Sequence, residues 1–454
     1  MPDTDPLFPL PEVQPAAVAA LETRGKPRLE TANRQQVEMR FAALDDLLPE
    51  DHRARLVWAL VQDYDLSRFY ARIKAVEGVA GHPAIDPRLL IAVWLYATVE
   101  GVVSGRELDQ LCKEHLAYQW LLGGVSVNYH TLTDFRTAYE TELDAVLTKS
   151  VAALLSEGVV SLDKTAQDGV RIRASAGASS FRRKPTLEDC LHQAEAVVTQ
   201  QKAERASTDP APRTAQRQAA QQRHAQEKVA RVKKALGEVD KVAAKKAQNR
   251  ESRRKAQPAR ASTTDPEARV MKMGDGGFRP AYSGQLAIDM DSRLIVGVDV
   301  SNAADTHELQ PMLAQLQTRY GRRPTEHYVD GGFRTNAGID QAAADGVAIF
   351  SPIPTRYSGK STKSPQDILP TDGPGVQAWK ARMVTPEAKE QYKQRAATIE
   401  WANALARLRG LYQLTVRGLH KARAVLLWFA LAHNLMQTVN LRTQRAAAAG
   451  QPGA

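Results

Sequence analysis

The chain has 454 residues, a net charge of +10 and two cysteines, Cys112 and Cys190, in unrelated contexts. This length allows two or three domains with cores of their own, and the cysteines support neither a disulfide framework nor a metal cage. The start of the chain lacks the basic and apolar segments of a signal peptide. The most apolar stretches, Leu89–Ala97 and Ala424–Ala432, are shorter than the roughly 20 residues of a membrane span. We therefore expect a cytoplasmic protein without a membrane segment, in which these stretches form buried helices.

The N-terminal third is predicted to be helical after a disordered segment, residues 1–36, that is rich in Pro, Ala and charge. Residues 37–157 contain a predicted helix over Arg88–Glu100 and a capping box, Ser104-Gly-Arg-Glu107, that begins the next helix. A second box, Thr131-Leu-Thr-Asp134, predicts a helix that continues through Tyr139 and Leu143. Two short helices around a Gly turn are typical of a DNA-binding helix-turn-helix, although an ordinary helical bundle has the same pattern.

From Gly158 the apolar residues alternate, which predicts a strand over Val159–Asp168 with Arg171-Ile-Arg-Ala as a continuation. Residues 182–266 follow as a basic insertion with a narrow apolar seam at helical spacing. Residues 171–270 hold 23 Lys and Arg against 11 Asp and Glu, so the whole positive excess of the chain lies there. Such a block is suited to neutralising phosphates, and we favour a DNA-binding helical arm over a merely solvated helix.

Strand patterns resume in residues 267–440, where Tyr282–Met290 and Leu294–Val300 predict a hairpin. A helix, the strand His327–Asp330, a second helix, the strand Val347–Ser351 and a helical end, Pro386–Asn440, complete the order. Residues 441–454 form a low-complexity tail, predicted to be disordered. The pattern predicts an α/β RNase H-like catalytic core in residues 158–181 and 267–440, preceded by an all-α domain and interrupted by the basic helical insertion.

Three acidic residues occupy settings that suit metal-dependent chemistry. Asp168 and Asp330 are each followed by Gly at a predicted strand end, and Glu400 lies on a predicted helix. Three carboxylates can bind a pair of Mg²⁺ ions, which activate a water or a 3′-hydroxyl and stabilise the leaving oxygen of a phosphodiester. Taken singly, each Asp-Gly pair could be an ordinary turn, and Glu400 an ordinary helical residue. Rival carboxylates of lower rank are Asp163, Asp289, Asp291 and Asp299.

Aromatic residues near these acids have competing interpretations. His327 and Tyr328, on the strand before Asp330, are interpreted as packing residues or as residues that support the acids from behind. Trp379 could stack on a flipped base near a DNA end, but a core position is equally compatible with its context. Trp401 and Trp428 are interpreted as core residues.

An ordered set of short motifs runs through residues 38–440, and together these motifs resemble those of bacterial insertion-sequence DDE transposases. The resemblance is to the group with a helical N-terminal domain and a Tyr-x2-Arg signature ahead of its last acid. The motifs are Leu48-Pro-Glu-Asp-His52, Ile85-Asp-Pro, Gly105-Arg-Glu-Leu, Phe135-Arg, Asp168-Gly-Val-Arg-Ile, Asp330-Gly-Gly-Phe-Arg, Trp379-Lys-Ala-Arg-Met, Tyr392-Lys-Gln-Arg395, Glu400 and His433-Asn-Leu.

The resemblance implies that Asp168, Asp330 and Glu400 are the catalytic acids and the ligands of two Mg²⁺ ions, for which Mn²⁺ can substitute. Asp168 would bridge both ions, and the other two acids would each complete one site. The expected DNA partners are the element's terminal inverted repeats and its target, bound by a homodimer in the synaptic complex of a nucleoid-associated protein. The residues assigned to DNA contacts are Tyr392, Arg395, Arg407, Arg136, Arg171 and Arg173.

Two alternatives to this transposase function remain open at the level of sequence. The chain could be a transposase-derived DNA-binding protein that no longer cuts DNA. It could also be an RNase H-like nuclease that recognises DNA structure and needs no specific terminal repeat.

Overall fold

The computed structural model describes residues 41–78, 82–207, 212–248, 258–354 and 364–448, together with Gln35, Val37 and Gly450. The chain divides into two compact units, residues 1–46 and residues 47–454. The first unit contributes the start of a 3₁₀ helix, η1 (Leu44–Leu47). All other elements belong to the second unit. The predictions for residues 1–34 and 451–454 lie outside the described residues. The disorder predicted for the rest of the tail is wrong for residues 441–448, which continue the last helix of the chain.

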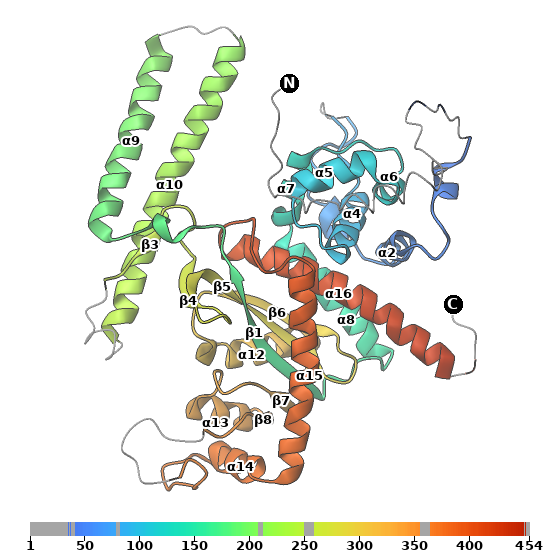
Figure 1. The fold of residues 1–454 in the computed structure, drawn as a ribbon, viewed down its shortest axis with the longest axis vertical. Helices are drawn as coiled ribbons and strands as arrows, with labels where there is room; N and C mark the ends of the chain where they lie inside the picture. The colour runs from blue at the N-terminus through green and yellow to red at the C-terminus, as the bar shows by residue number, and fades with distance from the viewer. Residues whose placement is uncertain are drawn as a thin grey trace, which may run out of the picture. The chain divides into compact units, whose positions relative to one another are not determined.

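A helical region precedes the sheet, as predicted (Figure 1). The helices are α2 (Arg53–Gln62), α3 (Ser67–Tyr70), α4 (Pro87–Val99), α5 (Gly105–Glu114), α6 (Leu116–Leu122), α7 (Tyr129–Ala138) and α8 (Glu140–Ser156). The apolar helix α4 forms the centre of this region, and its residues Trp94 and Leu95 are fully buried.

Capping side chains set the starts of these helices, and one sequence prediction about them is wrong. Ser104 accepts a hydrogen bond from the Glu107 backbone N–H at the start of α5, as predicted. The next long helix is capped by Asn128 rather than by Thr131, because the Asn128 side chain accepts the free N–H of Thr131 at 3.0 Å. The predicted continuous helix is also interrupted at Tyr139, so that α7 and α8 are separate helices.

The sheet combines antiparallel and parallel pairing, with strand order β4-β5-β1-β7-β8 and β6 also paired to β5. The antiparallel pairs are β1–β5, β5–β6 and β4–β5, whereas β1–β7 and β7–β8 are parallel. This antiparallel start with a parallel continuation is the predicted order. The strands are β1 (Lys164–Arg173), β4 (Arg269–Lys272), β5 (Phe278–Asp289), β6 (Ile295–Ser301), β7 (Glu326–Tyr328) and β8 (Ala348–Phe350).

The first strand begins later than predicted, at Lys164 instead of Val159. Gly158 and Leu162 both have positive φ, so the chain turns before it enters the sheet. Asp168 therefore lies in the middle of β1 and does not end it, because the predicted continuation Arg171–Arg173 belongs to the same strand. The predicted hairpin of β5 and β6 is confirmed.

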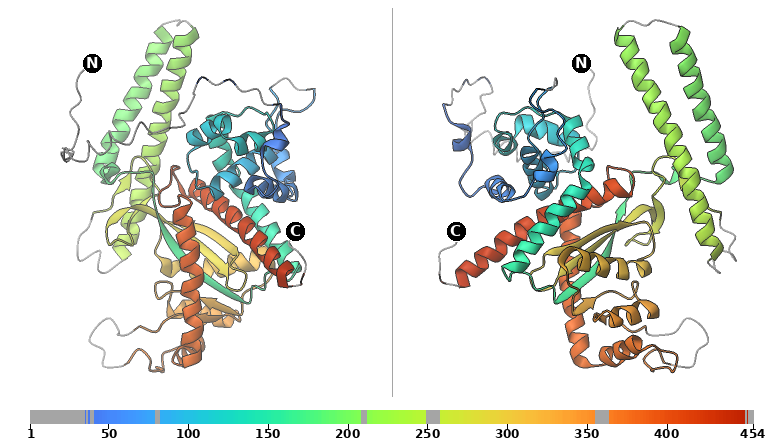
Figure 2. Two further views of the ribbon diagram at one scale, coloured as in Figure 1. Left: turned by 45° about the vertical axis from the view of Figure 1, so that its right-hand side comes forward. Right: turned by 180° about the vertical axis from the view of Figure 1, so that it is seen from behind.

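Helices cover both faces of the sheet. α12 (Leu309–Tyr320), preceded by η3 (Asp305–His307), packs on one face, where Gln315 hydrogen-bonds both backbone groups of Val298. α15 (Pro386–Leu408) and α16 (Leu419–Ala448) approach β1, β5 and β6 on the other (Figure 2). The remaining helices of this region are α13 (Asn336–Ala344), which has the predicted bounds, and α14 (Pro374–Met383), which was not predicted.

The basic insertion is a pair of long helices that lie side by side, α9 (Lys184–Ser207) and α10 (Pro212–Gln248) (Figure 1). The predicted seam is partly buried, with Val232 at 1% and Val239 at 2% exposure. A small separate core at the base of the pair includes Leu187 and Ala261. Short strands β2 (Phe181–Arg182) and β3 (Ala261–Ser262), with η2 (Ala178–Ser180), bring the two ends of the insertion together.

One helix has the length and composition of a membrane span, residues Leu419–Arg445 within α16. Most of its apolar window, 72%, is buried inside the protein. It contacts α4, α7, α8 and β6, and Trp428 at its centre is fully buried. The burial expected for Leu89–Ala97 and Ala424–Ala432 is confirmed except for the partly exposed Leu89, and α16 packs as a core helix.

Candidate active site

Asp168 lies on the face of β1 that is covered by α15. Side chains alternate along a strand, so Asp168 shares its face with Val170 and points away from Gln167 and Gly169. One turn of α15 reaches this carboxylate through Arg395, whose guanidinium lies 3.2 Å from Asp168 Oδ1. A second turn contributes Asn403, whose amide donates to Asp168 Oδ2 at 3.1 Å. Asp168 is therefore held in place by two side chains eight residues apart on one helix face.

The surroundings of Asp168 act on its charge in opposite directions. Burial of the carboxyl group raises its pKa, and the Arg395 guanidinium opposes this effect. The charge of Asp330 raises the same pKa further. The net direction is upward. A raised pKa with a nearby second carboxylate is the environment expected for a site that receives a cation.

Asp330 reaches the same site because of the parallel pairing between β1 and β7. The last paired residues are Ala166 and Tyr328, and two residues further along each chain stand Asp168 and Asp330. The Asp330 carboxylate accepts the Gly332 backbone N–H at 2.8 Å, which closes the turn after the strand. Asp330 as a whole is partly exposed. Two of the three predicted acids thus lie at neighbouring strand positions.

Glu400 lies on α15, three residues before Asn403, and its side chain is exposed. Positions three apart are neighbours on a helix surface, so Glu400 is adjacent to the face that contacts Asp168. Within the described part of the chain, no three Asp, Glu, His or Cys side chains lie close enough together to hold a metal ion. The structure therefore brings Asp168 and Asp330 together and leaves Glu400 exposed on α15.

Tyr392 and Arg395 contact the backbone at the two strands that carry these acids. The Tyr392 hydroxyl donates to the Val329 carbonyl at 3.2 Å, and Arg395 donates to the Gln167 carbonyl at 3.4 Å. Arg395 also lies 6.0 Å from the centre of the Tyr392 ring. Both side chains are thus engaged with the protein at the candidate site, next to the carboxylates.

The other residues assigned to DNA contacts differ in accessibility. Arg407 and Arg173 are exposed, whereas Arg171 forms a two-point ion pair with Asp305. Arg136 is 6% exposed and donates to the Val103 carbonyl inside the helical region. Of these four arginines, Arg407 and Arg173 have exposed side chains on the surface.

The rival carboxylates have other partners. Asp289 is fully buried and accepts hydrogen bonds from Leu162 and Ser292, which fixes the turn after β5. Asp163 precedes β1 and pairs with Arg322 at 2.7 Å. Asp299 lies 3.4 Å from Arg423, and Asp291 is exposed in the hairpin turn. None of these four lies beside Asp168 on its face of β1.

The aromatic residues near the site belong to the core. Trp379 is 3% exposed, and its indole N–H donates to the Ser351 carbonyl at 2.9 Å, which supports the core alternative. His327 and Tyr328 are both buried, and the His327 ring bonds to Gln167, the neighbour of Asp168 on β1. Trp428 is fully buried, and Trp401 is half-buried with its ring against His433.

Two features of the site were missed in the sequence. Asn403 was not singled out, because its hydrogen bond to Asp168 joins residues far apart in the chain and leaves no local signal. Behind Asp168, on the other face of the sheet, Gln167 bonds to His327 on β7 and to Gln285 on β5. This row of buried amides and a neutral imidazole joins the strands that carry Asp168 and Asp330.

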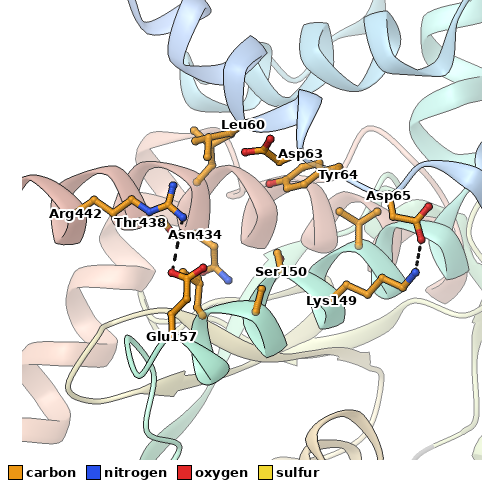
Figure 3. A pocket seen from close by; sticks show the side chains of 14 residues that line it. Leu60, Asp63, Tyr64, Asp65, Lys149, Ser150, Glu157, Asn434, Thr438 and Arg442 are labelled. Atoms are coloured by element: carbon orange, nitrogen blue, oxygen red, sulfur yellow. Dashed lines mark hydrogen bonds and ion pairs between the residues drawn. The ribbon is translucent and has the colours of Figure 1, made fainter. Parts of the chain in front are cut away.

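A cavity of about 300 Å³ lies between α2, α8 and α16 (Figure 3). Ion pairs between Asp65 and Lys149 and between Glu157 and Arg442 lie at its rim. None of the three predicted acids lines it. We therefore assign the candidate chemistry to the Asp168 site and not to this cavity.

Comparison with known families finds a match in the helical region. A family model described as a transposase domain (DUF772) matches residues 42–138, about a fifth of the chain. No curated protein and no solved structure matches. The helical region is thus similar to a transposase domain, which supports transposase as the class of this protein.

Proposed function

We propose that this protein is a DDE transposase of an insertion sequence, with an RNase H-like catalytic core built on β1, β5, β6, β7 and β8. The observation that carries the proposal is the register of β1 and β7, which puts Asp168 beside Asp330 under a helix that carries Glu400. The strand order supports an RNase H-like core. The transposase-domain match covers the helical region that precedes this core.

In this proposal Asp168, Asp330 and Glu400 are the ligands of two Mg²⁺ ions. Carboxylate oxygens are the ligands that Mg²⁺ prefers. The site as it stands provides two neighbouring acids, while the third is exposed on the adjacent position of α15. When bound, the ions would polarise the phosphodiester and activate water or a 3′-hydroxyl. Arg395 and Asn403 hold the Asp168 carboxylate in a fixed orientation.

The proposed partners are the terminal inverted repeats and target DNA, with a homodimer forming the synaptic complex at the nucleoid. The concentration of Lys and Arg in residues 171–270 supports contact with a polyanion. Within that block, α10 holds ten Lys and Arg against three Asp and Glu, whereas α9 holds three against four. The two helices form a helical arm next to the core, and α10 gives this arm its positive charge. Arg407 on α15 and Arg173 at the end of β1 add two exposed basic side chains.

The test compares nicking of duplexes from the flanks of the gene with nicking of random duplex, in Mg²⁺ and in EDTA. A transposase cuts at one position that depends on the terminal repeat. Equal cutting of both DNAs would favour a structure-specific nuclease, and binding without cutting in either metal condition would favour the inactive DNA-binding alternative. Asp168→Asn should abolish cutting, whereas Asp163→Asn, which removes a carboxylate paired to Arg322, should not.

A further inference from the structure

A second polar cavity lies in the helical region, apart from the Asp168 site. It has a volume of about 340 Å³ and is lined by residues of α4, α5 and α7 and by Thr415 and Val416. Two arginines, Arg106 and Arg136, belong to its wall, and no Asp or Glu does. Hydroxyl groups of Ser104, Tyr129, Thr133 and Thr415 complete its polar lining.

Arg136 is the unusual member of this wall. It is 6% exposed, yet its described hydrogen-bond partners are neutral: the Val103 carbonyl and the Thr415 hydroxyl. Its Nε has no hydrogen-bond partner, and its guanidinium lies 4.7 Å from the centre of the Trp94 ring. Burial lowers the pKa of this arginine to about 10.

Three other arginines with largely buried side chains are paired with carboxylates. Arg319 pairs with Asp144, Arg423 with Glu140 and Arg395 with Asp168. No ion pair joins Arg136 to a described acid. A buried charge without a counter-charge is strongly unfavourable, so the placement of Arg136 at a cavity wall calls for an anion.

We propose that this cavity binds a phosphate group, with Arg136 at its floor and Arg106 at its rim. Arg106 is exposed and lies over the Tyr129 ring at 5.5 Å, so it can reach an anion from solvent. Charge-assisted donors and hydroxyls of this kind are typical of phosphate recognition. Resting on the proposed function, we assign the phosphate to the backbone of bound DNA.

The position of the cavity indicates what a phosphate bound there would do. Thr415 and Val416 follow α15, the helix that carries Arg395 and Glu400, whereas Ser104 and Arg106 lie at the start of α5. One DNA phosphate in this cavity would contact both the helical region and the segment next to the catalytic helix. It would thereby fix the register of the DNA relative to the candidate active site.

The test uses the full chain and measures binding only, so a failure to cut DNA leaves it interpretable. Thermal unfolding is followed in sodium phosphate and in sodium chloride of equal ionic strength. Wild type and Arg68→Gln, an exposed arginine outside the cavity, should be stabilised by phosphate. Arg106→Gln and Arg136→Met should lose this stabilisation.

Salt dependence of duplex binding is the second arm. Each cavity variant should reduce the slope of log Kd against log salt by roughly one unit, as expected for one lost phosphate contact. Arg68→Gln should keep the slope of the wild type. Phosphate protection with unchanged slopes would overturn the DNA assignment in favour of a free phosphate compound. Absence of phosphate protection in wild type, with unchanged slopes, would overturn the site altogether. Arg106→Gln keeps the test valid if Arg136→Met fails to fold.

Discussion

At the residue scale, the Arg395 guanidinium favours the charged form of the Asp168 carboxyl group. The two groups lie 3.2 Å apart with side chains 24% and 11% exposed. Removal of the guanidinium leaves a largely buried carboxylate with Asn403 as its remaining side-chain donor. A hydrogen bond to a charged group contributes roughly 1.5–3 kcal/mol, and the partial exposure of Asp168 places the effect at the lower end.

We therefore predict that Arg395→Gln lowers the free energy of unfolding by about 1.5 kcal/mol, measured from urea midpoints. In the Asp168→Asn background the same substitution should cost much less, because the charge that Arg395 compensates is then absent. Arg407→Gln, on an exposed turn of the same helix, is the control and should have little effect. Equal costs in both backgrounds would show that Arg395 acts by packing alone.

Asn403 is predicted to orient Asp168. Asn403→Leu removes the donor, whereas Asn403→His preserves an N–H at this position. Cleavage by the leucine variant should fall at least tenfold with a higher Mg²⁺ requirement, and the histidine variant should recover part of it. If both variants cut DNA at the wild-type rate and Mg²⁺ requirement, Asn403 has no positioning role.

At the element scale, the Asp-Gly-x-Arg sequence of β1 is explained by the two faces of the strand. Asp168 points to α15, whereas Gly169 and Arg171 point to the opposite face. A Cβ on Gly169 would lie 2.8 Å from Ser283 Oγ and 2.9 Å from Asp305 Oδ1. The glycine therefore makes room for the polar row that contains the Arg171–Asp305 ion pair.

This gives a matched pair of glycine substitutions. Gly169→Ala should destabilise the protein by about 2 kcal/mol, because it forces buried polar partners apart. Gly237→Ala, in the middle of α10 with open space at its Cβ, should instead stabilise the helical pair by about 1 kcal/mol. Thermal unfolding followed by far-ultraviolet circular dichroism measures both. The interpretation of the polar row fails if Gly169→Ala is tolerated as well as Gly237→Ala.

Sequence patterns predicted elements well where a local signal dominates. α13 has the predicted bounds because Thr335 caps it and Asp345 ends it, and α9 and α10 follow from composition and helical spacing. The start of β1 was misplaced because Val159 and Val160 are apolar, yet the positive φ of Leu162 ends their alternation before the sheet. α14 was missed because tertiary contacts, and not a local pattern, hold it in place. Lys380 forms a buried ion pair with Asp372, and the Trp379 indole donates to the Ser351 carbonyl.

The candidate site was predictable in part for the same reason. Asp168 and Asp330 each precede a glycine and follow a strand pattern, and this local pattern made both residues recognisable in the sequence. Asn403 contributes a long-range hydrogen bond to Asp168, and no local pattern reports such a contact. Several motifs that accompany the acids are structural, since His52, Asp86 and Ser104 are helix caps and Asn434 bonds both backbone groups of Ile295.

At the scale of the whole molecule, two buried histidines link stability to pH. Burial lowers the pKa of His327 to about 3 and that of His433 to about 4, below the ordinary value near 6.5. The unfolded chain therefore binds protons below pH 6.5 that the native state rejects. The contribution of these two histidines to the free energy of unfolding is fully present above pH 6.5 and is lost as the pH drops toward 4.

We predict a fall of up to about 1.4 kcal/mol per pH unit for each histidine in this window, measured from urea midpoints between pH 7 and pH 4.5. His433→Asn should flatten the dependence, because an amide can still donate to the Arg293 carbonyl without titrating. His420→Asn, at an exposed position beside Glu140, is the control and should retain the steep dependence. A profile that His433→Asn leaves unchanged would contradict a buried neutral imidazole.

The central claim is that Asp168 and Asp330 form one metal-dependent centre for cutting DNA. The most direct measurement is Mg²⁺-dependent cleavage of duplexes from the DNA flanking this gene, mapped to the nucleotide, with wild type beside Asp330→Asn. A cut at one defined position in wild type, lost in Asp330→Asn while DNA binding persists, is the predicted result. A cut that Asp330→Asn makes at the same position and rate would contradict the assignment.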